Sequence, residues 1–557
     1  MMESKTKRWV GVARWLLPVM ALVLPDQASA QTPATFTPLD RPAYGLYTLI
    51  SRPLNFTAAD YAGLGQNFRF LHGNLSPEQF DAIRKVNPAF KGLRYINSTY
   101  TRFDADVGVV ESRYRMGLSM HLAAQTRDAL APDTTSFRVE SLEAGKKGRK
   151  ATIAIRASTV AGDLSSTNRD QPSTKHYVFW IRIGDELMRV NAFDEKSGVV
   201  KVTRGFSGTT PAAHATGAKV FSPIYLGFKR GNKDKYPGQH PGGPGDRLRY
   251  VLDPNSAAGW KYFSDQVVVA MTEGRTDGVW LDTLNVGDFN LSDCLGRKVE
   301  PWDFRSGRLY KPDDFREGQE RKMDFIQRDV KERLGRYPML VANNLKPSSF
   351  YPGSGGMRRL LESTEVKPRP LDGFCMEGGL SWQKADEEHE VNTWRSRIVM
   401  LMDAAQNGLA AMPIWGGAGG QSVGSEPDTP GRDRAERFAY ASYLLAVEKE
   451  GRTLMGTYAI YQADGRRFVK VHPMYFYPIG DPAESVKPNE FDRYALNEGA
   501  VYRRRFTNGQ VLVNASDMSQ RVDFEESFID PDTGRRVSGI DMAPGTGKIL
   551  LSAKGAP

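Results

Sequence analysis

The chain has 557 residues, 40% of them hydrophobic and 25% charged, with a formal net charge of +10. A chain of this length is too long to fold around a single hydrophobic core, so we expect a soluble globular protein with two or three domains. Basic residues are scattered among acidic ones, which argues against specific nucleic-acid binding. The net positive charge is consistent with a weak attraction of the protein to anionic surfaces or polymers.

The first 30 residues have the pattern of a cleavable secretion signal. Four basic residues, the last of them Arg14, precede the apolar run 15–25, and Ala28-Ser29-Ala30 matches a small-residue cleavage site. The apolar run is short for a bilayer span, and no other segment is a candidate. We therefore predict a secreted or periplasmic protein whose mature chain starts at Gln31 and has no membrane span.

Cysteine and histidine usage predicts neither a disulfide framework nor a metal site. Cys294 and Cys375 are the only cysteines, so the sequence allows at most one disulfide bond and leaves open whether it forms. The seven histidines show no ligand spacing, and the segment 389–393 (HEVNT) lacks the second histidine of a zinc-protease motif. We expect no metal and no cofactor.

The mature chain begins with strand–helix units typical of a parallel α/β fold. Residues 44–50, 68–72 and 92–98 read as strands. Thr57 with Asp60, and Ser76 with Gln79, form capping pairs that begin the intervening helices. This spacing predicts parallel βα architecture over residues 31–133.

Residues 134–222 break this rhythm with short alternating strands and turn residues. We predict an all-β module inserted into a βα loop, where barrels accept insertions. Its segments 183–190 (IGDELMRV) and 202–210 (VTRGFSGTT), followed by His214 and Gly217, resemble a small β-module of phage tail and other surface proteins. The resemblance implies a compact module and no activity.

Residues 223–460 resume the βα pattern, and residues 461–557 lose it. Further strands are expected at 277–282, 338–345, 371–378, 410–415 and 453–460, with helices at 256–273, 313–334, 393–407 and 432–450. Eight strands with intervening helices predict a TIM (β/α)8 barrel, a fold of the α/β class. After residue 461, short strands and the Asn508-Gly509 turn predict an antiparallel β-sandwich domain packed on the barrel.

Two of the predicted strands end in a carboxylate. Each opens with Asp-Gly, continues with apolar residues, and closes with Asp282 or Glu377. The ends of buried parallel strands form the mouth of a barrel, where its chemistry is carried out. A facing pair of acids suits hydrolysis of a glycosidic bond, because one protonates the leaving oxygen while the other attacks the anomeric carbon or activates water. The opening residues Asp277 and Asp372 are interpreted as turn residues.

The segments 277–282 (DGVWLD), 372–377 (DGFCME) and 502–514 (YRRRFTNGQVLVN) resemble glycosyl-hydrolase-like TIM barrels, relatives of the endo-α-1,4-polygalactosaminidases and of α-galactosidase-type barrels. The likeness covers most of the chain outside the signal and the insertion. It implies that Asp282 is the nucleophile, that Glu377 is the general acid/base, and that the substrate is a polysaccharide or oligosaccharide.

Five further residues are candidates for substrate binding. They follow or lie near the predicted strand ends, where hydroxyl-binding and sugar-stacking groups belong, although each also fits a structural role. These residues are His72, Asn97, Asn343, Trp382 and Trp415.

Two other functions stay open. Ser422 lies in the segment 420–424 (GQSVG), which fits the G-x-S-x-G motif of a secreted serine esterase but has no helix directly after it. Alternatively, the protein is a noncatalytic glycan-binding or surface-assembly protein, in which the barrel is a scaffold and the β-modules bind. The sequence favours the glycoside hydrolase.

Overall fold

The computed structural model describes residues 36–553, except for 51–55, 74, 100–115, 141–179, 195–196, 227–250, 283, 285–290, 293–298, 344–346, 348–356, 362–369, 378–379, 383–392, 415–429, 458–459 and 464–465. The predicted signal segment lies outside these residues. Within them, no helix is long and apolar enough to cross a bilayer.

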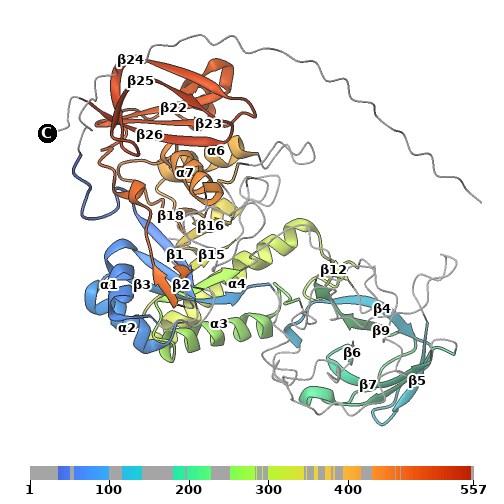
Figure 1. Cartoon of the computed structure of the whole chain (residues 1–557). Helices are drawn as coiled ribbons and strands as arrows, with labels where there is room; N and C mark the ends of the chain where they lie inside the picture. Colours follow the sequence, from blue (N-terminus) through green and yellow to red (C-terminus); the bar gives the residue numbers. More distant parts are fainter. Residues whose placement is uncertain are drawn as a thin grey trace, which may run out of the picture.

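A closed barrel of eight parallel strands forms the centre of the molecule (Figure 1). Every neighbouring pair is parallel, which confirms the prediction of an eight-stranded βα barrel. The eighth strand is shorter than predicted. Around the barrel the order is β1 (Leu46–Ile50), β2 (Phe70–Gly73), β3 (Lys91–Asn97), β11 (Gly278–Asp282), β15 (Met339–Ala342), β16 (Gly373–Glu377), β17 (Ala411–Ile414) and β18 (Met455–Gly456).

The helices that follow these strands begin where the capping residues predict. Asp60 Oδ2 accepts from the Thr57 N–H at 2.9 Å, and Gln79 Oε1 accepts from the Ser76 N–H at 2.9 Å, so both predicted capping boxes form. The described helices are α1 (Ala58–Asn67), α2 (Pro77–Val86), α3 (Ala257–Thr272), α4 (Pro312–Leu334), α6 (Trp394–Gln406) and α7 (Pro430–Leu444), with a 3-10 helix η5 (Met357–Leu361) after β15.

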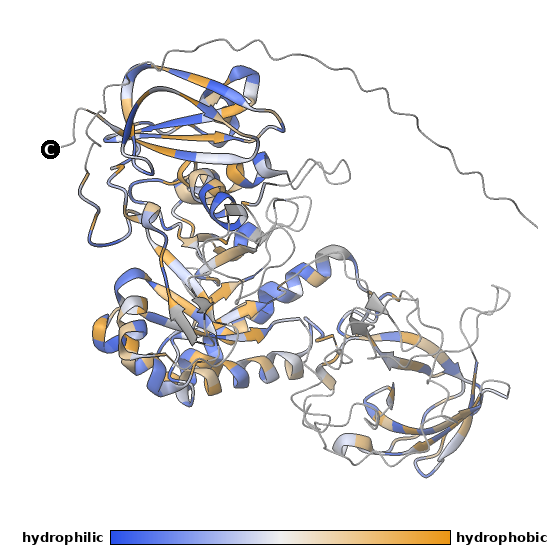
Figure 2. Cartoon of the chain, in the orientation of Figure 1, coloured by the Kyte–Doolittle hydropathy of each residue, from blue (hydrophilic) through white to orange (hydrophobic). Residues whose placement is uncertain are grey.

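The interior of the barrel is a packed core, and its strands appear as apolar segments in Figure 2. Trp280 reaches across it to Tyr47, with ring centroids 5.8 Å apart. Cys375 is buried, and its Sγ lies 3.1 Å from the Tyr47 hydroxyl, whereas Cys294 lies outside the described residues. Because side chains alternate along a strand, Asp282, two residues after Trp280, shares its inward face at the carboxyl end of β11.

The inserted module is a second closed barrel, of six antiparallel strands. In spatial order these are β4 (Met120–Thr126), β5 (Ser136–Glu140), β8 (Val199–Thr203), β7 (Glu186–Asp194), β6 (Trp180–Ile183) and β9 (Lys219–Pro223). The module begins at β4, ahead of the predicted boundary at residue 134. The reason is composition: β4 (MHLAAQT) carries two alanines and a glutamine, which give little β propensity.

A buried ion pair organises one end of this module. Glu186 is 1% exposed, and both of its oxygens accept from the Arg204 guanidinium at 2.7 Å. His214 and the backbone N–H groups of Gly205 and Ala212 complete its partners at 2.9–3.1 Å. Burial acts to raise the pKa of Glu186, but the hydrogen bonds from Arg204, His214 and the two N–H groups outweigh it and lower the pKa to about 2.

Acid is therefore expected to destabilise the inserted module. A carboxyl group whose pKa is lower in the folded than in the unfolded chain stabilises the fold above pH ~4.3 and loses that contribution as the pH falls towards ~2. Glu186→Gln should destabilise by about 3–5 kcal/mol at pH 7, because the buried guanidinium of Arg204 keeps its backbone carbonyl acceptors but loses its counter-ion. Urea unfolding at a series of pH values, followed by tryptophan fluorescence, to which the buried Trp180 of this module contributes, measures both effects.

Glu140→Gln is the matched control, since Glu140 pairs with Arg127 on the surface of the same module. It should change the unfolding free energy by less than about 1 kcal/mol. Equal effects of the two substitutions would contradict the role given to Glu186.

Aromatic contacts attach the module to the βα loop that follows β11. This loop forms the hairpin β13 (Trp302–Asp303) and β14 (Arg308–Leu309). The Phe221 ring lies 5.4 Å from that of Trp302 and 4.8 Å from that of Phe304, and the Arg182 guanidinium lies 3.7 Å above Phe304. The module is thus connected to the barrel on the segment that follows Asp282.

The C-terminal region folds as a six-stranded antiparallel sheet on another side of the barrel (Figure 1). One face packs on α7 so closely that a Cβ at Gly547 would lie 2.5 Å from Ala441 Cβ. This face packs on a barrel helix, as expected for a domain packed on the barrel, but the described strands form one sheet, so the predicted sandwich is not confirmed. In spatial order the strands are β21 (Ala495–Leu496), β22 (Val501–Phe506), β23 (Gly509–Asn514), β26 (Thr546–Ser552), β24 (Gln520–Asp530) and β25 (Arg535–Met542).

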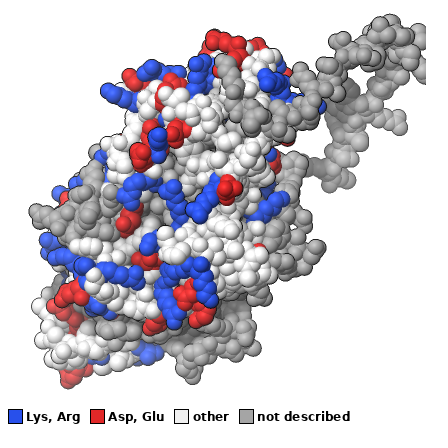
Figure 3. Space-filling view, turned by 90° about the vertical axis from the view of Figure 1, so that its left-hand side faces the viewer, with Lys and Arg blue, Asp and Glu red and all other residues white. Residues whose placement is uncertain are grey.

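Short elements connect these parts. They are β10 (Tyr225–Leu226) paired with β12 (Leu291–Ser292), the hairpin β19 (Ile460–Ala463) and β20 (Arg466–Val469), and the 3-10 helices η4 (Phe206–Gly208), η7 (Pro473–Phe476), η8 (Pro488–Tyr494) and η9 (Asn497–Gly499). On the face shown in Figure 3, basic and acidic side chains are interspersed, as their distribution in the sequence suggests.

Arg504 is one of the residues that connect the C-terminal sheet to α7. Arg504, on β22, is 1% exposed, and its guanidinium donates to the carbonyl oxygens of Leu444, Leu445 and Val447 at 2.5–3.3 Å. These carbonyls lie at the C-terminal end of α7, where the last carbonyl groups of a helix have no backbone N–H partner within the helix. Arg504 therefore acts as a C-terminal cap supplied from another domain.

Candidate active site

Asp282 is the last residue of β11 and is held by hydrogen-bond donors from both neighbouring strands. Its Oδ1 accepts from Asn343 Nδ2 at 3.0 Å. Its Oδ2 accepts from the Tyr95 hydroxyl and, at 3.4 Å, from Asn97 Nδ2. Tyr95 and Asn97 lie on β3, and Asn343 directly follows β15, so closure of the barrel brings these groups together.

These donors are all neutral, which leaves the carboxylate of Asp282 without a salt bridge among the described residues. Neutral donors orient an ionised carboxylate while leaving it available to a ligand. Asp277, at the other end of β11, differs from Asp282 because it has cationic partners. It forms ion pairs with Arg84 at 2.9 Å and Lys91 at 3.0 Å and accepts from the Gly92 N–H, contacts that fit its interpretation as a turn residue at the start of the strand.

Two of the predicted substrate-binding residues, Asn97 and Asn343, therefore contact the predicted nucleophile. They bind Asp282 itself, so their described contacts orient the carboxylate. Any contact that they make with a substrate stays a prediction.

His72 lies on β2 and packs against Trp280, which fills the interior of the barrel. Its ring stacks on that of Trp280, with centroids 3.7 Å apart and an interplanar angle of 10°. It is 7% exposed, and burial lowers the pKa of His72 to about 3, so the imidazole is neutral at ordinary pH. Its Nδ1 has no hydrogen-bond partner in the described part of the chain. A neutral ring nitrogen of this kind is suited to a ligand hydroxyl or a water molecule.

Tyr95, which contacts Asp282, is not among the site residues predicted from the sequence. Strand alternation could have found it, because Tyr95 lies two residues before Asn97 on β3 and so shares its face. What the sequence lacks is the register that sets Asn97 opposite Asp282.

Removing the hydroxyl of Tyr95 should impair whatever reaction Asp282 performs. Tyr95→Phe deletes a hydrogen bond to a charged group, which corresponds to about a 10- to 100-fold loss in kcat. Tyr47→Phe is the control, since Tyr47 also lies inside the barrel but donates to the Met412 carbonyl. Steady-state kinetics of both variants measure the difference, and equal effects would remove Tyr95 from the site.

The other predicted site residues are not brought into contact with Asp282 by the described structure. The backbone of Glu377 is the last position of β16, two residues after Cys375, and its side chain lies outside the described residues. Trp415 and Ser422 also lie outside them.

Trp382 packs beneath the C-terminal domain. A Cβ at Gly545 would lie 2.3 Å from its ring, and the Arg434 guanidinium lies 5.6 Å from the ring centre. Sugar stacking by Trp382 stays a prediction. In the described part of the chain, no group of three His, Cys, Asp or Glu side chains is arranged to hold a metal.

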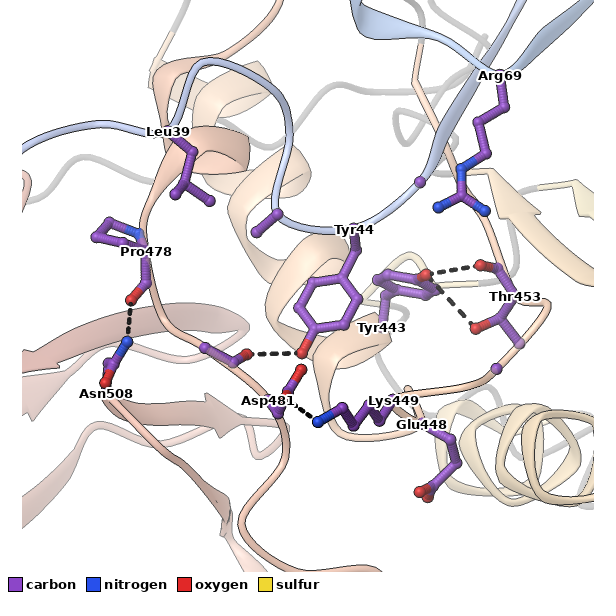
Figure 4. Close-up of a pocket in the computed structure, with 14 residues that line it drawn as sticks. Leu39, Tyr44, Arg69, Tyr443, Glu448, Lys449, Thr453, Pro478, Asp481 and Asn508 are labelled. Carbon is purple, nitrogen blue, oxygen red and sulfur yellow. Dashed lines mark hydrogen bonds and ion pairs between the residues drawn. The ribbon is translucent and has the colours of Figure 1, made fainter. Parts of the chain in front are cut away.

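A cavity of about 260 Å³ lies elsewhere, between the barrel and the C-terminal sheet (Figure 4). It is lined by residues that precede barrel strands, such as Arg69 before β2 and Thr453 before β18. Its polar groups largely bond one another: Lys449 pairs with Asp481 at 2.8 Å, and Tyr443 donates to the Thr453 carbonyl. This cavity lies at the end of the barrel opposite Asp282, an end that in such folds serves stability.

Neither a protein-family model nor a curated protein matches the chain. Three solved structures show a limited likeness. They are a cycloisomaltooligosaccharide glucanotransferase from a Paenibacillus species (TM-score 0.31, 10% identity, 91% of this chain and 55% of that one), the glycoside hydrolase domain of a PelA variant from Pseudomonas aeruginosa (0.32, 10%, 75% and 95%) and pyruvate kinase from Cryptosporidium parvum (0.29, 9%, 75% and 66%). The chain thus spans about half the length of the first. Likeness at this level of identity and TM-score assigns no activity to this chain.

Proposed function

We propose that this protein is a secreted glycoside hydrolase that cleaves a polysaccharide or oligosaccharide at the mouth of the barrel. The observation that carries the proposal is the environment of Asp282. A carboxylate at the carboxyl end of a barrel strand is held by Tyr95, Asn97 and Asn343 and has no cationic partner in the described structure. A structural aspartate such as Asp277 is instead paired with arginine and lysine.

In this reaction Asp282 acts as the nucleophile or as the stabiliser of positive charge at the anomeric carbon. Glycosidic cleavage passes through an oxocarbenium-like transition state, which an ionised carboxylate stabilises and an ion-paired one stabilises less. The donors on both of its oxygens fix the direction of the carboxylate without neutralising it.

Glu377 is proposed as the general acid/base. It ends β16, two strands around the barrel from β11, so its position is at the same end of the barrel as Asp282. A carboxylic acid there protonates the leaving oxygen, and as a carboxylate it then activates the water that completes hydrolysis. His72 is proposed to bind a sugar hydroxyl through its Nδ1, which has no hydrogen-bond partner among the described residues.

Release of reducing ends from a panel of bacterial exopolysaccharides and cell-wall glycans tests this function. The hydrolase is supported by release that depends on Asp282. Binding of a glycan without release by the wild-type protein would favour the noncatalytic glycan-binding alternative. Ester cleavage that is lost in Ser422→Ala and retained in Asp282→Asn would favour the esterase.

A further inference from the structure

A lysine is buried where α4 packs against α3 and the end of β3. Lys322, on α4, is 1% exposed, and its ammonium nitrogen lies 5.0 Å from the centre of the Phe263 ring of α3. No carboxylate pairs with it among the described residues. Burial of an ammonium group without a counter-ion is strongly unfavourable, so its presence indicates a role that an apolar residue would not fill.

The contacts of Lys322 lead to the main chain of Asp282. Its Nζ donates to the carbonyl oxygen of Ser98 at 2.7 Å. Ser98, which follows β3, in turn donates twice to the carbonyl oxygen of Asp282, from its N–H at 2.9 Å and from its hydroxyl at 3.0 Å. Lys322 and Asp282 are therefore connected through one residue.

We propose that Lys322 is a positioning residue for Asp282. By holding the carbonyl of Ser98, it fixes the turn of chain that carries both donors to the Asp282 carbonyl. Those donors set the end of β11, and with it the direction of the Asp282 carboxylate. A displacement of about 1 Å at a reacting group lowers a rate by about 100-fold, so a buried support of this kind affects catalysis. The inference rests on the role of Asp282 in the proposed function.

The protonation of Lys322 should be visible in solution. Burial lowers the pKa of Lys322 to about 7, and the groups that face it, the Ser98 carbonyl and the Phe263 ring, carry no charge. In the unfolded chain the pKa of lysine is about 10.4. Between these values the unfolded state binds more protons, so the free energy of unfolding should rise with pH from ~7 to ~10.

The variant Lys322→Met keeps the volume of the side chain and removes the charge and the donor. We expect kcat to fall about tenfold with KM changed less than about twofold. Deuterium exchange of peptides that contain Ser98 should become about tenfold faster, without a similar change in the rest of the barrel. The rise in stability between pH ~7 and ~10 should disappear.

Lys331→Met is the matched control. Lys331 lies on the same helix but is exposed, and its Nζ donates to the Gly335 carbonyl at the helix end. It should leave kcat and the exchange near Ser98 unchanged. A folded Lys322→Met protein with wild-type exchange near Ser98 overturns the inference, and so does faster exchange throughout the barrel, because Lys322 would then support the whole fold.

Ser98→Ala provides a second test that does not require Lys322→Met to fold. It removes one of the two donors to the Asp282 carbonyl and should itself lower kcat. If both single variants fold, the two effects should be less than additive in the double variant, and full additivity contradicts the inference. Failure of the proposed function is distinguished by Asp282→Asn: full activity there removes Asp282 from catalysis, whereas the exchange measurement reports on Lys322 without any substrate.

Discussion

Asp282→Asn is expected to lower hydrolysis at least about a thousandfold while the barrel stays folded. The amide has the shape of the carboxylate, and its oxygen still accepts from Tyr95 or Asn343. It has no negative charge with which to attack the anomeric carbon or stabilise positive charge there. Initial rates of reducing-end release, with circular dichroism as the check on folding, measure the effect.

Asp277→Asn is the matched control on the same strand. Asp277 lies at the opposite end of β11 and pairs with Arg84 and Lys91. Its loss should change stability by about 1 kcal/mol or less and leave kcat unchanged. A wild-type rate in Asp282→Asn would exclude Asp282 from the mechanism.

Glu377→Gln belongs to the same test of the carboxylate pair. Loss of the acid should slow substrates with poor leaving groups by orders of magnitude and affect aryl glycosides with good leaving groups less, because these need little protonation. Asp372→Asn is its control, since Asp372 accepts from the Leu340 N–H at the other end of the strand pair. Equal losses on both substrate types would contradict the role of Glu377 as the acid.

Arg504→Met is expected to destabilise the protein by about 3–5 kcal/mol. The substitution leaves the carbonyl groups at the end of α7 and the carbonyl of Glu484 buried without this donor. Each unpaired buried carbonyl costs about 1–3 kcal/mol, partly recovered where the structure relaxes. Urea unfolding of the full chain, followed by circular dichroism and by deuterium exchange of α7, measures the loss.

Arg505→Met is the control for this prediction, because Arg505 is the next residue on β22 and is exposed. Its effect should stay within about 0.5 kcal/mol. Arg504→Lys should fall between the two, since an ammonium group lacks the five donors of the guanidinium. Unfolding curves of Arg504→Met that coincide with the wild type would show that α7 and the C-terminal sheet are held together without this arginine.

Several features follow from local sequence patterns. The boxes at Thr57 and Ser76 depend on residues three positions apart, so the helix starts are encoded within one turn. The eight barrel strands are short apolar runs with turn residues on either side, and a strand that ends in Asp282 identifies a carboxylate at the mouth. These signals need no knowledge of distant partners.

Other features depend on contacts between distant segments. Tyr95 reaches Asp282 because β3 and β11, separated by the inserted module, pair in one register. The sequence pattern indicates only that Lys322 is a polar residue of an amphipathic helix. The packing of α4 against the end of β3 buries it. The C-terminal strands predict a sandwich packed on the barrel, whereas the structure has one six-stranded sheet with α7 against one of its faces.

The sequence by itself thus determined the barrel, its insertion and the strand-end position of Asp282, because hydrophobic periodicity and capping act over a few residues. The tertiary structure decided which groups surround Asp282 and what covers the C-terminal sheet. The physical reason is that register and packing are set by the closure of the whole barrel, which brings together residues about 60 to 190 positions apart in the chain.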